Sequence, residues 1–126
     1  MNQRDTLLYG AVLGGLGVAL GAVGAHVLKP MLLANNRIET YEIAARYQVV
    51  HALALLIAGA LMTQVHDKTL RWAATCWVAG ILFFSGSLYA LSFTSITAVA
   101  YLTPVGGLLF LTGWFFLAMA ILRIDR

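Results

Sequence analysis

The sequence predicts an all-α, polytopic membrane protein whose four transmembrane helices form an up-down bundle. Hydrophobic residues make up 61% of the 126 residues, charged residues make up 10%, and the mean hydropathy is +0.86. Such values are typical of integral membrane proteins. Since a helix needs roughly 20 apolar residues to cross a bilayer, about four or five spans would use almost the whole chain. We therefore expect no soluble domain within it.

We expect the spans at residues 6–27, 41–64, 70–92 and 98–122 of a single transmembrane domain that covers residues 1–126. The longest connection, residues 28–40, contains Lys29-Pro30, which ends the first helix because proline disfavours helical geometry in the residue before it. The connections at residues 65–69 and 93–97 are short. Short connections make successive helices antiparallel, which predicts the up-down arrangement.

Glycines dominate one face of the first span. They recur at spacings of four and three residues, and at about 100° per residue they fall within an arc of about 80°. In a soluble helix each interior glycine costs about 1 kcal/mol relative to alanine, whereas in lipid a face without side chains lets another helix approach closely. We expect helix packing, within or between subunits, at Gly10, Gly14, Gly17, Gly21 and Gly24.

A cleaved signal peptide is the alternative interpretation of the first span. Arg4 would be its charged start, and the small residues near Ala25 would be its cleavage site. The apolar stretch is longer than the usual ~7–15 residues, and cleavage would discard the glycine face. We therefore expect a retained helix.

Basic residues predict the orientation in the cell inner membrane. The side that holds more Lys and Arg faces the cytoplasm, and the third connection, with no Lys or Arg, fits a translocated position. We therefore expect both termini in the cytoplasm. The side shared by the termini and the second connection has five basic residues: Arg4, Lys68, Arg71, Arg123 and Arg126. The opposite side has three: Lys29, Arg37 and Arg46.

The second span begins with ionisable and polar residues and continues as an apolar helix. Glu39, Glu42 and Arg46 share one side, where Glu42 and Arg46 have the four-residue spacing of an ion pair and Arg46 can extend to the interface. Tyr47, Gln48 and His51 form a second stripe. It continues through Ala54 and Ala58, which predicts that His51 faces the bundle interior. This stripe is either a hydrogen-bonded cluster that fixes helix register or a proton-handling or ligand site.

The histidines raise the question of a cofactor. We expect His26 and His51 to lie toward the same membrane face, where a pair could ligate haem or a metal. No third ligand or dense Cys/His cluster accompanies them, so we expect neither a cofactor nor a metal. His66 is interpreted as a solvated residue. Cys76 is the single cysteine, which excludes an internal disulfide and is typical of an inert buried thiol.

Hydroxyl groups gather on the third span, where Ser85, Tyr89 and Ser92 share a face. They either complete a polar cavity or bond to helix carbonyls. The fourth span opens with Thr103-Pro104 and carries a second packing face formed by Gly106, Phe110, Gly113 and Leu117. The candidate polar intramembrane site therefore consists of His26, Arg46, Tyr47, Gln48, His51, Ser85, Ser87, Tyr89 and Thr103.

Four segments in order resemble the signatures of the domain-of-unknown-function 423 family, which includes bacterial inner-membrane proteins and is similar to the eukaryotic transmembrane protein 256. The resemblance implies a small four-span membrane protein and carries no catalytic residues with it. It covers nearly the whole chain. The segments are residues 21–28 (GAVGAHVL), 47–55 (YQVVHALAL), 84–89 (FSGSLY) and 103–107 (TPVGG).

Several functional classes are excluded or disfavoured. The net charge of +3 comes from basic residues at span ends, so we expect no nucleic-acid binding. The sequence shows no nucleophile with a base, no phosphate loop and no paired acidic residues at membrane depth, so we do not expect an enzyme. Asp67 and Asp125 are interpreted as solvated end charges.

Three hypotheses remain. The first is a structural or accessory membrane protein, as a homo-oligomer or as a subunit of a larger complex. The second is a small proton-coupled transporter or ligand-binding protein with a polar site around His51, and the third is a haem- or quinone-linked redox component. Membrane lipid is an expected partner in each case, with anionic headgroups at Arg71, Arg123 and Arg126. We favour the first hypothesis.

Overall fold

Four antiparallel helical spans form the protein in the computed structural model, which describes residues 1–124. Each is long and apolar enough to cross a membrane, and they cover Gln3–Ala25, Ile38–Leu61, Lys68–Thr94 and Thr97–Leu122. The predicted all-α membrane fold is confirmed. The second span begins three residues before the expected position, and the third begins two residues before it. Asp125 and Arg126, which the sequence assigned to the chain end, lie outside the described residues.

Local breaks divide the spans into shorter elements. A short helix, α2 (Lys29–Ala34), with Pro30 in its first turn, lies between α1 (Gln3–Ala25) and α3 (Ile38–Leu61). The third span consists of α4 (Lys68–Gly80), a single π-helical stretch η1 (Ile81–Ser85) and α5 (Gly86–Thr94). A 3-10 turn, η2 (Thr97–Tyr101), precedes α6 (Leu102–Leu122). The sequence analysis missed α2, because Lys29-Pro30 indicated only that α1 must end.

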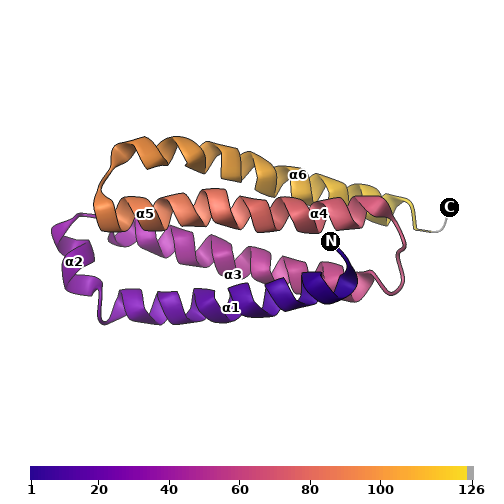
Figure 1. Ribbon diagram of the computed structural model, residues 1–126, viewed down its shortest axis with the longest axis horizontal. Helices are drawn as coiled ribbons and strands as arrows, with labels where there is room; N and C mark the ends of the chain where they lie inside the picture. The colour runs from indigo at the N-terminus through magenta and orange to yellow at the C-terminus, as the bar shows by residue number, and fades with distance from the viewer. Residues whose placement is uncertain (125–126) are drawn as a thin grey trace.

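The spans are stacked in chain order, with α1 and α6 as the outer helices (Figure 1). α1 packs mainly on α3, and α6 packs mainly on α4 and η1. In the most apolar window of each span, 50% of residues are buried in the second span, but only 17% in the first and 22% in the fourth. Helices α1 and α6 therefore offer most of their surface to lipid. The N-terminus and the end of α6 lie at the end of the bundle opposite α2 (Figure 1).

The glycines of α1 divide into two groups. Gly10, Gly17 and Gly24 are buried against α3, where a side chain would not fit: a Cβ at Gly10 would lie 2.9 Å from Leu56 Cγ, and one at Gly24 would overlap the ring of Tyr41. A Cβ at Gly14 would make an ordinary contact, 3.6 Å from Ala52, and one at Gly21 would have no atom within 4 Å. Close contact with α3 therefore occurs at every seventh residue, at Gly10, Gly17 and Gly24, and not along the whole glycine face.

Close helix contact also depends on glycines in the third and fourth spans. A Cβ at Gly106 would overlap the backbone nitrogen of Phe84 in η1, and one at Gly113 would overlap the indole of Trp77. A Cβ at Gly80 would lie 2.5 Å from the ring of Phe110. Because lipid tails give no hydrophobic drive for helix association, these van der Waals contacts help to hold the spans together.

Candidate functional site

His51 lies in the middle of α3 and is 3% exposed. Its Nδ1 lies 2.8 Å from the carbonyl oxygen of Tyr47, one turn earlier. Its Nε2 lies 3.0 Å from the indole nitrogen of Trp114 in α6. A carbonyl only accepts and an indole N–H only donates, so the proton is on Nδ1 and the lone pair of Nε2 is used by Trp114. Both nitrogens of the neutral ring are therefore satisfied within the protein.

Aromatic side chains cover the imidazole of His51. The ring of Phe110 stacks on it with centroids 3.6 Å apart and planes 8° apart. Trp114 meets it edge-on at 5.8 Å, and Trp77 lies at 6.4 Å. Phe110 and Trp114 are four residues apart, so α6 presents both on one face. This enclosure leaves His51 as a contact between helices rather than an open ligand.

Gln48 connects three helices. Its amide nitrogen donates to the Leu13 carbonyl of α1 at 2.9 Å, and its amide oxygen accepts from the Tyr89 hydroxyl of α5 at 2.8 Å. The neighbouring Tyr41 donates its hydroxyl to the Leu20 carbonyl of α1, and its ring meets that of Tyr89 edge-on at 5.2 Å. These bonds fix the register of α1, α3 and α5.

The hydroxyls of the third span bond to neighbouring helices and to their own turns. Ser85, at the end of η1, donates to the Ala44 carbonyl of α3 at 2.8 Å. Ser87 lies 2.6 Å from the hydroxyl of Thr103 in α6, whereas Ser92 donates back to the Leu88 carbonyl. Within the described residues, these hydroxyls thus form separate hydrogen bonds, some between helices and some within one helix, rather than lining one cavity.

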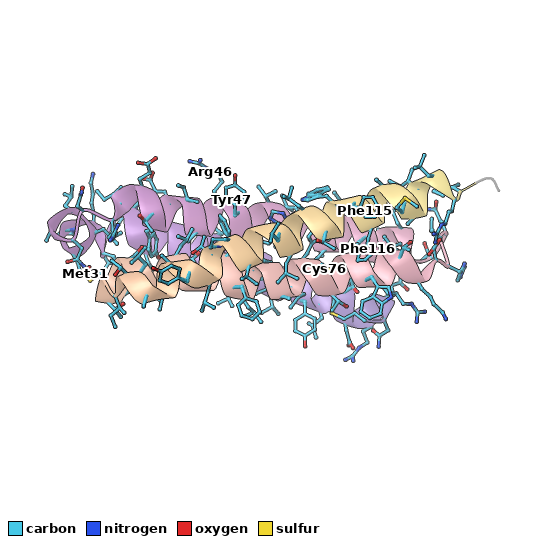
Figure 2. The ribbon with its side chains drawn as sticks, turned by 90° about the horizontal axis from the view of Figure 1, so that it is seen from above. Met31, Arg46, Tyr47, Cys76, Phe115 and Phe116 are labelled. Atoms are coloured by element: carbon cyan, nitrogen blue, oxygen red, sulfur yellow. The ribbon has the colours of Figure 1, made fainter. Side chains whose placement is uncertain are left out.

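Two of the candidate residues, Arg46 and His26, lie apart from this network, and Tyr47 lies at its edge, with its ring 6.1 Å from that of His51. Tyr47 shares a helical stripe with His51, yet it is 41% exposed, with its ring beside Phe84 and Phe110. Arg46 is exposed and projects from the same edge of α3 as Tyr47 (Figure 2). His26 is exposed just beyond α1, and His51 is held by other side chains, so the structure does not bring the two histidines together.

The expected ion pair between Glu42 and Arg46 is absent from the part of the chain that the structure describes. The ion pair found there joins Arg123 to Asp67 at 3.2 Å. Asp67 also caps α4 by accepting a hydrogen bond from the backbone N–H of Thr69 at 2.8 Å. Asp67 therefore lies at a span end and, beyond what the sequence indicated, joins the end of α6 to the start of α4.

A cavity of about 450 Å³ lies among α1, α2 and α3, at the end of the bundle far from the termini. Its lining includes Gly21, Tyr41 and three charged residues, Lys29, Glu42 and Arg46. Of the nine residues of the candidate polar site, Arg46 alone belongs to this lining. The charged cavity is thus separate from the hydrogen bonds of the candidate polar site in the interior of the bundle.

No group of three His, Cys, Asp or Glu side chains that could hold a metal ion occurs within residues 1–124. Cys76, labelled in Figure 2, lies on α4 and is a half-buried free cysteine, and His66 is exposed between α3 and α4. The residue that the sequence analysis missed is Trp114. It follows Gly113 and lies four residues after Phe110, both of which marked the packing face of the fourth span, but nothing in the sequence pairs it with His51.

Comparison with known proteins identifies the family of the chain. The family model described as "Protein of unknown function (DUF423)" matches residues 20–107. The chain belongs to this family. The matched region contains the whole of α3 and the third span, with Gln48, His51, Ser85 and Tyr89. The resemblance proposed from the sequence is thereby confirmed.

Relatives of this DUF423 protein are named as membrane proteins. It is 40% identical to the UPF0382 membrane protein SAB0533 of Staphylococcus aureus over 90% of this chain and 92% of that protein. It is 35% identical to the UPF0382 inner membrane protein YgdD of Escherichia coli K12 over 100% of this chain and 95% of that protein. No solved structure matches the chain. The names place the family in membranes and give no activity.

Proposed function

We propose that this DUF423 protein is a structural or accessory membrane protein that acts through helix contacts and carries out no intramembrane chemistry. The observation that carries the proposal is the state of His51: both ring nitrogens bond to protein groups, and Phe110 covers one face. Gln48 and Ser85 are also used in bonds between helices. A site for proton transfer or catalysis would need some of these groups free to meet a substrate.

The proton-coupled transporter is the second candidate, and the same geometry disfavours it. A proton carrier at His51 would need access to Nε2, which accepts from Trp114. Reconstituted wild type and His51→Gln in liposomes with a pH gradient test this point. We expect equal proton flux from both proteins. A flux that the wild type supports and His51→Gln abolishes would overturn the structural assignment of His51.

Partners of an accessory protein would meet the lipid-exposed faces of the outer helices. Val18 on α1 is 64% exposed and Phe115 on α6 is 61% exposed. Figure 2 labels Phe115 on α6. A photo-crosslinking amino acid at each position in living cells tests the proposal, with the buried Leu55 position as the control. We expect an adduct of defined mass, with a second copy or another membrane protein, from at least one outer helix. If the protein stays monomeric and forms no adduct from either position, the proposal is contradicted.

We also propose that both termini face the cytoplasm. Arg4, Lys68, Arg71 and Arg123 support this orientation, because they belong to the ends of spans on the side of the termini. Fusions of alkaline phosphatase and of green fluorescent protein to the C-terminus test it. We expect fluorescence without phosphatase activity, and the reverse result would contradict the orientation.

A further inference from the structure

The cavity among α1, α2 and α3 is lined by charged residues that the accessory role leaves unused. It lies beside the start of α3, at the end of the bundle opposite the N-terminus (Figure 1). Lys29 enters its lining from α2, and Glu42 and Arg46 enter from α3. None of these three takes part in an ion pair in residues 1–124. The cavity therefore brings together two cations and one carboxylate that have no ionic partner there.

Arg46 lies deeper than the other two charges. It is eight residues after the first residue of α3, which corresponds to about 12 Å along the helix axis. An arginine at this depth extends its guanidinium toward the interface, where lipid phosphate groups lie. Figure 2 shows the Arg46 side chain projecting from the edge of α3 rather than into the bundle.

An apolar stripe continues below Arg46 on α3. Val50, Leu53 and Ile57 follow it by four, seven and eleven residues, so they share its face, and they are 46%, 55% and 57% exposed. Charged groups above and exposed apolar groups below match a molecule with a polar head and long acyl chains. A free inorganic anion would use only the upper part of this surface.

We propose that the cavity binds the headgroup of an aminophospholipid, one that carries a phosphodiester and a primary ammonium. Lys29 and Arg46 hold the phosphate by charge-assisted hydrogen bonds, and Glu42 holds the ammonium. The acyl chains lie along Val50, Leu53 and Ile57. Glu42 decides between headgroups, since a carboxylate attracts an ammonium and gains much less from an uncharged glycerol.

Gly21 keeps the cavity open. A Cβ at this position would have no atom within 4 Å, unlike one at Gly24, which would meet the Tyr41 ring. Because Gly21 lines the cavity and its Cβ position is open, the side chain of Gly21→Leu would start from open space rather than against α3. Gly21→Leu therefore tests the effect of filling the cavity separately from the effect of disrupting the fold.

Native mass spectrometry of the delipidated full chain in detergent tests the proposal. Phosphatidylethanolamine and phosphatidylglycerol with the same acyl chains are titrated separately, and inorganic phosphate is added as a competitor. We expect tighter binding of phosphatidylethanolamine. Arg46→Gln should lower its affinity about tenfold, the loss expected for one charge-assisted hydrogen bond. The control Lys68→Gln, at the other end of the bundle, should leave the affinity unchanged.

Two further variants sharpen the result. Glu42→Gln should remove the preference for phosphatidylethanolamine, and Gly21→Leu should weaken binding of both lipids while keeping the wild-type circular dichroism and melting temperature. Equal effects of Arg46→Gln and Lys68→Gln would overturn the site. A preference for phosphatidylglycerol that Glu42→Gln leaves intact would overturn the headgroup assignment, and displacement of lipid by millimolar phosphate would overturn the lipid itself as the ligand.

Discussion

Trp114 donates its indole N–H to Nε2 of His51 across 3.0 Å, and this bond joins the middle of α3 to α6. This bond gives Nε2 of the buried His51 a donor, so the nitrogen is not left unpaired among apolar side chains. Phe110, one turn before Trp114, stacks on the same imidazole. The two helices are thus joined by a polar bond and an aromatic stack at one level of the bundle.

Removing the indole donor should weaken this junction. Trp114→Phe leaves His51 Nε2 without a partner, and we expect a loss of about 1 kcal/mol in the free energy of unfolding, the usual scale for interhelical hydrogen bonds in membranes. Steric-trap unfolding in bicelles measures it. Trp72→Phe is the matched control, because Trp72 is 59% exposed on α4. Equal stabilities of the two variants would show that the Trp114 bond contributes nothing.

The contact between η1 and α6 should tolerate no side chain at Gly106. The Cβ of Gly106→Ala would overlap the Phe84 backbone, which cannot rotate away as a side chain can, so we expect a loss of about 1–3 kcal/mol. At Gly107 the nearest atom to an added Cβ is 3.9 Å away, and Gly107→Ala should be neutral or gain up to about 1 kcal/mol. Thermal unfolding of the two variants in one detergent compares them. A larger loss from Gly107→Ala would contradict the packing described for η1.

The bond between Gln48 and Tyr89 should appear as energetic coupling. A double-mutant cycle with Gln48→Leu and Tyr89→Phe should give a coupling of about 0.5–1 kcal/mol, because both single variants remove the same 2.8 Å bond. Equilibrium unfolding of the four proteins supplies the cycle. Strict additivity would show that the two residues stabilise the bundle independently.

Asp67, outside the spans, makes the stability depend on pH. The backbone N–H and hydroxyl of Thr69, together with Arg123, hold the pKa of its carboxyl below the ordinary value. Because the folded pKa lies below the unfolded one, the stabilisation is fully present above the unfolded pKa. It is lost as the pH falls through the folded pKa.

The variant Asp67→Asn keeps a capping side chain but removes the charge. We expect it to be less stable than wild type at pH 7 and the difference to shrink as the pH falls below about 4, where the unfolded aspartate begins to bind a proton. Thermal unfolding at a series of pH values measures the difference. A difference that stays constant from pH 7 to pH 3 would rule out the proposed role of the charge.

The sequence was sufficient for the spans, because runs of apolar residues and short connections determine their number and direction. It also marked Gly10, Gly17 and Gly24, whose seven-residue spacing matches the contact with α3. It did not separate these from Gly21, because glycine leaves the same pattern whether it admits a neighbouring helix or opens a cavity. The helical wheel placed Tyr47 and His51 on one stripe, and their rings do stack with centroids 6.1 Å apart. It could not show which face of α3 meets which span, so it did not reveal that Tyr47 is exposed and His51 is buried.

Bonds between distant residues were beyond sequence reasoning for a physical reason. The partner of Gln48 on α1 is a backbone carbonyl, which every residue possesses, and the partner of His51 lies 63 positions away. The π-helical stretch at Ile81–Ser85 packs closely against Gly106, a contact between distant parts of the chain that local sequence preference does not reveal. The spacing of Glu42 and Arg46 predicted an ion pair, but Arg46 instead extends from the edge of α3.

The most direct test of the structural role of the polar interior is nuclear magnetic resonance of the protein in nanodiscs, with ¹⁵N labels in histidine and tryptophan. The account predicts that at pH 7.5 Nδ1 of His51 carries the proton and that a scalar coupling across the hydrogen bond links Trp114 Nε1 to His51 Nε2. The Trp114→Phe variant should lose this coupling. A proton on Nε2, or no coupling in the wild type, would contradict the account, because His51 would then be free to bind or transfer a proton.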